Sequence, residues 1–159
     1  MGTITTGLSN GFKLELLKGN HDFDNDTFRV ALIKESPTGS FGPTTLAYSE
    51  LGSDQASGTG YTSTYDTLST GAEAAIATGF PQMDGTTAIM DFDDAVFQSV
   101  TTAADGCILY NPNADSAANV IAVFNFGGAT QGQTVSATSG DFTVQFPAPG
   151  ASSSILRLA

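Results

Sequence analysis

The chain has 159 residues, with five Lys or Arg against 16 Asp or Glu and a formal net charge of −11. This length suits one domain with its own core, and the acidic excess repels phosphate, so we expect no nucleic-acid partner. No apolar run approaches the roughly 20 residues of a membrane helix, and the first residues lack a signal-peptide pattern. We therefore expect a soluble cytosolic product with no membrane partner.

The N-terminal stretch is predicted to contain an arm and a short helix. Residues 1–8 have no partner strand nearby in sequence, so they are predicted to form a flexible arm. A helix is predicted over Asn10–Lys18, with Ser9 as its N-cap and Gly19 as its stop. Its apolar side chains recur at intervals of four and predict docking against a sheet: Leu8, Phe12 and Leu16, with Leu17 beside them.

An acidic segment, His21–Asp26, follows the helix. Asp22, Asp24 and Asp26 alternate as carboxylates do in a calcium loop, so a bound cation is one interpretation. The sixth-position Gly and the closing bidentate Glu of such a loop are missing. We therefore favour a turn in which the acids cap backbone N–H groups.

Strand patterns occupy most of the remaining chain. Val120–Phe126 is apolar on both faces, so it is predicted to be the central strand, paired in a long-looped hairpin with Cys107–Tyr110. Asp84-Gly85 is a hairpin turn signal. The other predicted strands are Thr27–Lys34, Tyr61–Leu68, Ala74–Phe80, Thr86–Phe92, Val96–Val100, Thr134–Ala137, Asp141–Phe146 and Ser153–Leu158.

These patterns predict an all-β fold, an antiparallel β-sandwich that is jelly-roll-like, with about eight to ten short strands and one short N-terminal helix. Residues 9–159 are expected to form a single β-sandwich domain. The segment Glu35–Thr59 is rich in Gly, Ser, Thr and Pro and is unusually long for a loop. It is predicted either to fold over the sheet edge or to contact another chain.

Residue chemistry argues against catalysis. One His and one Cys cannot supply a zinc site, and a Ser-His-Asp set would have to use His21, in an acidic turn. Cys107 lies in an apolar run and is expected to be a small buried hydrophobe. Asp91, Asp93 and Asp94 are interpreted as a solvated turn. We expect no enzyme activity, no cofactor and no metal.

Several stretches in the same order resemble a family of small structural proteins of tailed bacteriophages, some of which are head decoration (cement) proteins. They are FKLELLKGNHDFDNDTFRVALIK at 12–34, GTGYTS at 58–63, GTTAIMDFDDAVF at 85–97, GCILYNPNADSAANVIAVFNFGG at 106–128 and GDFTVQFPAPGASSSILRLA at 140–159. The resemblance implies a virion protein, made in the host cytoplasm, that binds the major capsid protein on the outer surface of the head. It also implies a homo-oligomer, with a trimer expected.

The predicted subunit contacts lie in the N-terminal arm and the long loop. We expect residues 1–8 and Ser36–Ser57 to become ordered only where subunits meet, because extended β-prone arms gain order at another chain's sheet edge. The candidate interface residues are Ile4, Leu8, Phe41, Leu46, Tyr48 and Leu51.

The alternative is a tail or head-fibre module that binds a bacterial surface glycan. Exposed aromatic faces would hold the sugar, and the candidates are Tyr61, Tyr65 and Tyr110.

Overall fold

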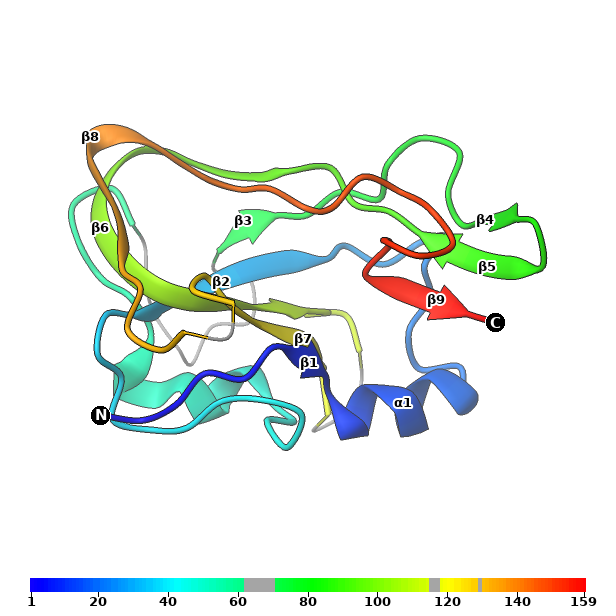
Figure 1. Cartoon of the computed structure of the whole chain (residues 1–159), viewed down its shortest axis with the longest axis horizontal. Helices are drawn as coiled ribbons and strands as arrows, with labels where there is room; N and C mark the ends of the chain where they lie inside the picture. Colours follow the sequence, from blue (N-terminus) through cyan, green and yellow to red (C-terminus); the bar gives the residue numbers. More distant parts are fainter. Residues whose placement is uncertain (62–70, 115–117, 129) are drawn as a thin grey trace.

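The protein consists mainly of two antiparallel β-sheets, and its computed structural model describes residues 1–61, 71–114, 118–128 and 130–159 (Figure 1). The prediction of an all-β, sandwich-type antiparallel fold with a short N-terminal helix is confirmed. The elements in chain order are β1 (Gly7–Leu8), α1 (Asn10–Leu17), β2 (Arg29–Lys34), the 3₁₀ helix η1 (Tyr48–Asp54), β3 (Ala72–Glu73), β4 (Gln82–Asp84), β5 (Thr87–Met90), β6 (Ala95–Tyr110), β7 (Val120–Asn125), β8 (Val135–Val144) and β9 (Leu156–Leu158).

The larger sheet has the strand order β1-β7-β6-β2-β3, and β8 also pairs with β6. β6 is therefore the central strand, with β2 and β7 beside its C-terminal half and β8 along its N-terminal half. The sequence analysis had predicted that the strand now seen as β7 would be central. The hairpin of β6 and β7 is present, but the predicted strand Cys107–Tyr110 is only the end of β6, whose length gives it three partners.

Two pairs of predicted strands are joined in the structure. Val96–Val100 continues into β6, and Thr134–Ala137 and Asp141–Phe146 belong to one strand, β8. Two serines lie at irregularities in the β6–β8 pairing and have positive φ: Ser139, where a turn was predicted between the two parts of β8, and Ser99, inside the predicted strand Val96–Val100. Bulges of this kind bend a strand without ending it.

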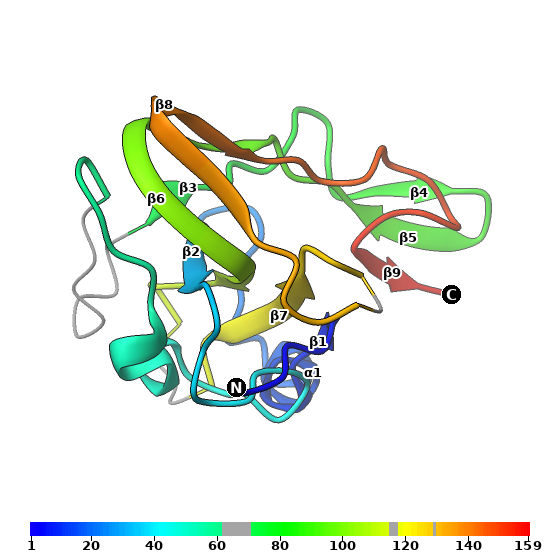
Figure 2. The same ribbon diagram turned by 60° about the vertical axis from the view of Figure 1, so that its left-hand side comes forward.

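The smaller sheet has the order β4-β5-β9 and lies at the end of the molecule opposite η1 (Figures 1 and 2). Its hairpin turns at Asp84-Gly85, as predicted. The strand expected over Ala74–Phe80 is wrong, because only Ala72–Glu73 and a single bridge at Ile76 pair there. The strand expected over Tyr61–Leu68 lies, apart from Tyr61, outside the described residues.

The part of the larger sheet made by β2, β7 and the C-terminal half of β6 is buried on both faces, as the apolar pattern of these strands predicts, whereas β8 is mostly exposed. Alternate residues of β2 enter two separate clusters: Val30 and Leu32 join one, and Ala31 and Ile33 join the other. The first cluster also contains side chains from α1, β8 and the small sheet. The second is closed by the N-terminal segment and the 35–59 loop.

The N-terminal residues pack against the domain, which differs from the predicted flexible arm. Ile4 is 2% exposed and bridges Phe41, while β1 pairs with β7. The approach is close enough that a Cβ added to Gly2 would lie 1.7 Å from the carbonyl oxygen of Gly39. The arm orders inside one chain because the second face of the larger sheet is apolar and needs a cover.

Helix α1 occupies the predicted residues except Lys18, and it ends where Gly19 adopts a φ of 74°. Ser9 stands at the N-cap, but its hydroxyl donates to the carbonyl of Thr45 and caps no helical N–H. Phe12 is buried and Leu16 is half-buried, whereas Leu17 is 87% exposed. The helix therefore docks with a narrower apolar stripe than its sequence offers.

Candidate functional site

Most of the predicted interface residues lie inside the single chain. Four of the six are buried in the cluster under the 35–59 loop, and Leu8 is half-buried against the other cluster. Leu46 alone is exposed, at 39%. The buried four are Ile4, Phe41, Tyr48 and Leu51. This corrects the prediction that the arm and the loop order only at subunit contacts, because their apolar side chains complete the monomer's core.

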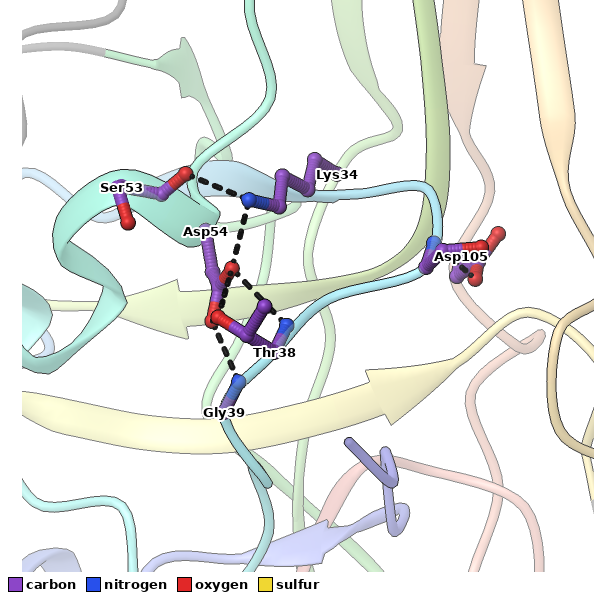
Figure 3. Close-up of polar contacts among 7 residues, drawn as sticks. Lys34, Thr38, Gly39, Ser53, Asp54 and Asp105 are labelled. Atoms are coloured by element: carbon purple, nitrogen blue, oxygen red, sulfur yellow. Dashed lines mark hydrogen bonds and ion pairs between the residues drawn. The ribbon is translucent and has the colours of Figure 1, made fainter. Parts of the chain in front are cut away.

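A buried carboxylate, Asp54 at the end of η1, holds the first part of the long loop in place (Figure 3). It pairs with Lys34 Nζ at 2.8 Å and accepts hydrogen bonds from the backbone N–H groups of Thr38 and Gly39 and from the Thr38 hydroxyl. Lys34 also donates to the carbonyl of Ser53. Burial alone would raise the pKa of Asp54, but these donors outweigh it and lower the pKa to about 2. The cluster is a structural tie between β2, the loop and η1.

A second buried acid, Asp105, serves the start of the same loop. It accepts from the backbone N–H of Ser36 at 2.9 Å and from the hydroxyl of Thr134 at 2.6 Å. The residue lies in β6 beside the register shift of the β2–β6 pairing. Both buried acids therefore satisfy donors of the long loop.

The acidic segment after α1 forms the turn that the sequence favoured. Asp22 accepts from the backbone N–H of Asp24 and from the Asn25 amide, and Asp26 accepts from the backbone N–H of Asp22. Across the described residues, no three His, Cys, Asp or Glu side chains gather into a group that could hold a metal ion. The structure thus gives these carboxylates backbone-capping roles.

His21 is buried between this turn and the helix. Its Nδ1 lies 3.2 Å from Asn111 Nδ2, which also donates to Asp26, while its Nε2 has no hydrogen-bond partner among the described residues. Its ring packs edge-on against Phe12. Burial lowers the pKa of His21, and the negative charges of Asp26 and Glu15 offset part of this effect. The imidazole therefore fills space beside Phe12, and its burial disfavours the protonated form.

Buried aromatic and thiol groups offer no reactive or sugar-binding surface. Cys107 is fully buried, as predicted, and burial raises the pKa of its thiol. Tyr61 and Tyr110 are also buried, and burial raises the pKa of Tyr61 to about 12 although Gln55 and the Leu32 N–H donate to its hydroxyl. Tyr65 lies outside the described residues. Two of the three tyrosines proposed to stack on glycan are thus inaccessible.

The surface feature best suited to recognition is a groove between α1 and the small sheet, which we call the α1–β9 groove. It encloses about 290 Å³, and its lining is almost wholly apolar. Phe12, Leu16 and Leu17 of α1 contribute one side, and β5 and β9 contribute the other. Figure 1 shows these elements at the end of the molecule where the chain terminates.

Strand register explains the apolar side of the small sheet. Met83 pairs with Ala88 and Ala88 pairs with Leu158, so the three share one face; Met90 and Leu156 form the next row on it. The Met90 row is buried, whereas Met83 and Leu158 are more than half exposed. The small sheet therefore carries an apolar face that begins in the core and continues into solvent.

Two of the five basic residues lie at the same groove. Lys13 on α1 lines it, and Arg157 on β9 lies at its edge, with a side chain that the β5–β9 register places on the face opposite Leu156 and Leu158. Each donates to a neutral oxygen, Lys13 to Asn10 and Arg157 to the carbonyl of Ala151, and within the described ranges neither forms a salt bridge. Arg29 donates to a carbonyl at the far strand pair, and Lys18 and Lys34 pair with acids. The apolar groove thus lies beside two cations that form no ion pair within the described residues, Lys13 on the groove side and Arg157 on the other face of β9, on a chain of net charge −11.

Sequence reasoning missed this surface. Leu17 was assigned to the stripe that docks against the sheet, and no surface was predicted for Leu14 or for the last strand. The helix has more leucines than one apolar stripe can hold, because Leu14 and Leu17 fall outside the face that contains Phe12. This surplus could have indicated an exposed apolar surface.

No helix in the described part of the chain combines the length and apolar character required to cross a bilayer. Comparisons with protein-family models, with curated proteins and with solved structures found no match.

Proposed function

We propose that the chain is a virion structural protein of a tailed bacteriophage, a decoration (cement) protein that binds the outer surface of the head and stabilises it. The observation that carries the proposal is the α1–β9 groove with its exposed apolar rim. Exposed apolar area of this kind marks contact with another macromolecule more often than it marks chemistry. The resemblance of five ordered sequence stretches gives the partner, the major capsid protein.

The rest of the molecule suits a protein that works by contact. The buried acids Asp54 and Asp105 are used to hold loops, and the acids after α1 cap a turn. The acidic surface disfavours contact with packaged DNA, which suits an outer position on the head. A homotrimer at three-fold positions remains part of the proposal on the resemblance alone, because the arm and loop residues expected at its interface are buried in one chain.

Cryo-electron microscopy of the virion tests the proposal. We expect density for this fold on the outer surface of the head, at positions of three-fold symmetry. Finding the protein only on the tail, or finding none in purified virions, would overturn the proposal.

A further inference from the structure

We infer that the α1–β9 groove binds an extended, acidic segment of another protein, with apolar side chains that enter the groove and carboxylates that pair with Lys13 and Arg157. The inference rests on the proposed function for the partner's identity, a capsid subunit, but its chemistry is argued from the groove itself. The partner is a different protein, and neither a second copy of this chain nor a small amphiphile is the occupant.

The extent of the apolar surface favours a macromolecule. Two highly exposed side chains, Leu17 on α1 and Leu158 on β9, line the groove, and Met83 continues the apolar face of the small sheet outside its lining. These are three of the eight large apolar residues exposed in the described chain. A ligand confined to about 290 Å³ would leave Met83 and the outer parts of Leu17 and Leu158 in water, whereas a polypeptide crossing the groove would cover them.

The edge position of β9 favours an extended segment. Leu156–Leu158 pairs with β5 on one side and, among the described residues, with no strand on the other. An edge strand presents backbone N–H and C=O groups that an incoming strand can pair with. Since β9 also lines the groove, a strand added there would place alternate side chains against its apolar wall.

The cations decide the charge of the occupant. Lys13 and Arg157 lie on the two elements that form the walls, and no carboxylate among the described residues neutralises either one. A groove-to-groove dimer would bring Lys13 of both copies into one apolar contact, which is unfavourable, whereas Arg157 lies on the face of β9 where alternate side chains of an added strand would point. A partner segment that alternates apolar residues with Asp or Glu would neutralise both cations while its apolar residues fill the groove.

Peptide binding to the full chain tests the inference directly. The probe is a labelled peptide that alternates Leu and Glu, and its matched control alternates Leu and Lys. We expect the Leu–Glu peptide alone to bind, and to bind more weakly as salt is raised, because the charges lie at the surface. Failure of the Leu–Glu peptide to bind, or equal binding of both peptides, would overturn the inference.

Variants locate the site. Leu17→Glu should weaken binding of the Leu–Glu peptide by about tenfold or more, whereas Val135→Glu, at an exposed apolar position on β8 outside the groove, should leave it unchanged. The double variant Lys13→Glu/Arg157→Glu should reverse the preference and bind the Leu–Lys peptide. Because all four positions are exposed, thermal unfolding should confirm that each variant folds. An unchanged preference in the double variant would contradict the charge assignment.

Two further measurements separate the competing occupants. Sedimentation that shows a dimer abolished by Leu17→Glu, without peptide binding, would assign the groove to a second copy. Binding of dodecanoate without peptide binding would assign it to an amphiphile, and either result overturns the inference. If the Leu17→Glu variant still binds empty heads, the groove is not the binding site, and the decoration role is unaffected. If the protein binds the peptide but not the heads, the groove inference holds and the decoration role is contradicted.

Discussion

The two ends of the molecule use apolar side chains in opposite ways. At the η1 end, the N-terminal segment and the 35–59 loop cover a sheet face, and Ile4, Phe41 and Tyr48 are almost fully buried. At the α1 end, Leu17 and Leu158 point to solvent at 87% and 64% exposure. Both ends have similar residue types, so composition alone does not distinguish core from contact surface.

The charged residues follow the same division. At the η1 end, Lys34 and Asp54 neutralise each other within a network of loop donors. At the α1 end, Lys13 lines an apolar groove and Arg157 lies on the other face of β9, and neither forms an ion pair among the described residues. The charges described at the η1 end are paired within the chain, whereas the α1 end leaves apolar area and positive charge exposed.

Deleting residues 2–8 should have the largest effect on stability. It removes β1 and exposes the cluster that Ile4 covers, so we expect the free energy of unfolding to fall by about 4 kcal/mol or more. Denaturant unfolding measures this, with the exposed substitution Thr3→Ala as control. An unchanged transition after the deletion would restore the free arm that the sequence predicted.

Replacing Asp54 with Asn should lower the free energy of unfolding by about 2–3 kcal/mol, because Lys34 and the loop N–H donors lose a buried charged acceptor. The exposed Glu35→Gln serves as the matched control. The folded pKa of about 2 lies below the ordinary 3.8, so this contribution is present above pH 3.8 and is lost as the pH falls through about 2. A difference between variant and wild type that is constant over this range would contradict the account.

His21 should make stability depend on pH in a milder range. Its pKa is lowered in the folded state, so the unfolded chain binds the proton more readily. The free energy of unfolding should therefore be fully retained above about pH 6.5 and decrease as the pH falls below it. Thermal unfolding at pH 7.5 and 5.5 should show a smaller difference for His21→Gln than for wild type. If stability changes equally with pH in the wild type and in His21→Gln, protonation of His21 does not affect the free energy of unfolding.

Leu17→Ser should have the smallest effect, within about 0.5 kcal/mol, because the side chain is almost wholly in water. Phe12→Ala, in the same helix but 2% exposed, should cost about 3–5 kcal/mol. Chemical denaturation of the two variants tests the division within a single helix. A large loss in Leu17→Ser would place that residue in the core and remove the apolar rim.

Local patterns predicted the elements better than their partners. The two-faced apolar strand, the helix with its Gly19 stop, the Asp84-Gly85 hairpin and buried Cys107 follow from short-range periodicity and turn chemistry. The continuity of β8 did not, because Ser139 was interpreted as part of a turn, whereas the β6–β8 pairing continues past it through an irregularity. Such pairing is a non-local property.

The candidate site was harder to predict for the same reason. Whether an apolar residue covers the chain's own sheet or remains exposed depends on which segments reach that face. Tyr48 was expected outside and lies inside, while Leu17 was assigned to the docking stripe and lies outside. The loop reached one sheet face because Asp54 and Asp105 fix it there, and the sequence gives no local sign of these long-range bonds.

Hydrogen exchange of the full chain, with and without the proposed binding partner, empty phage heads, tests the central claim most directly. If the α1 end is the contact surface, amides of Asn10–Leu17 and Leu156–Leu158 should gain protection on binding, while residues 1–8 and 36–57 should be protected already in the isolated chain. New protection confined to residues 1–8 and 36–57 would contradict the account.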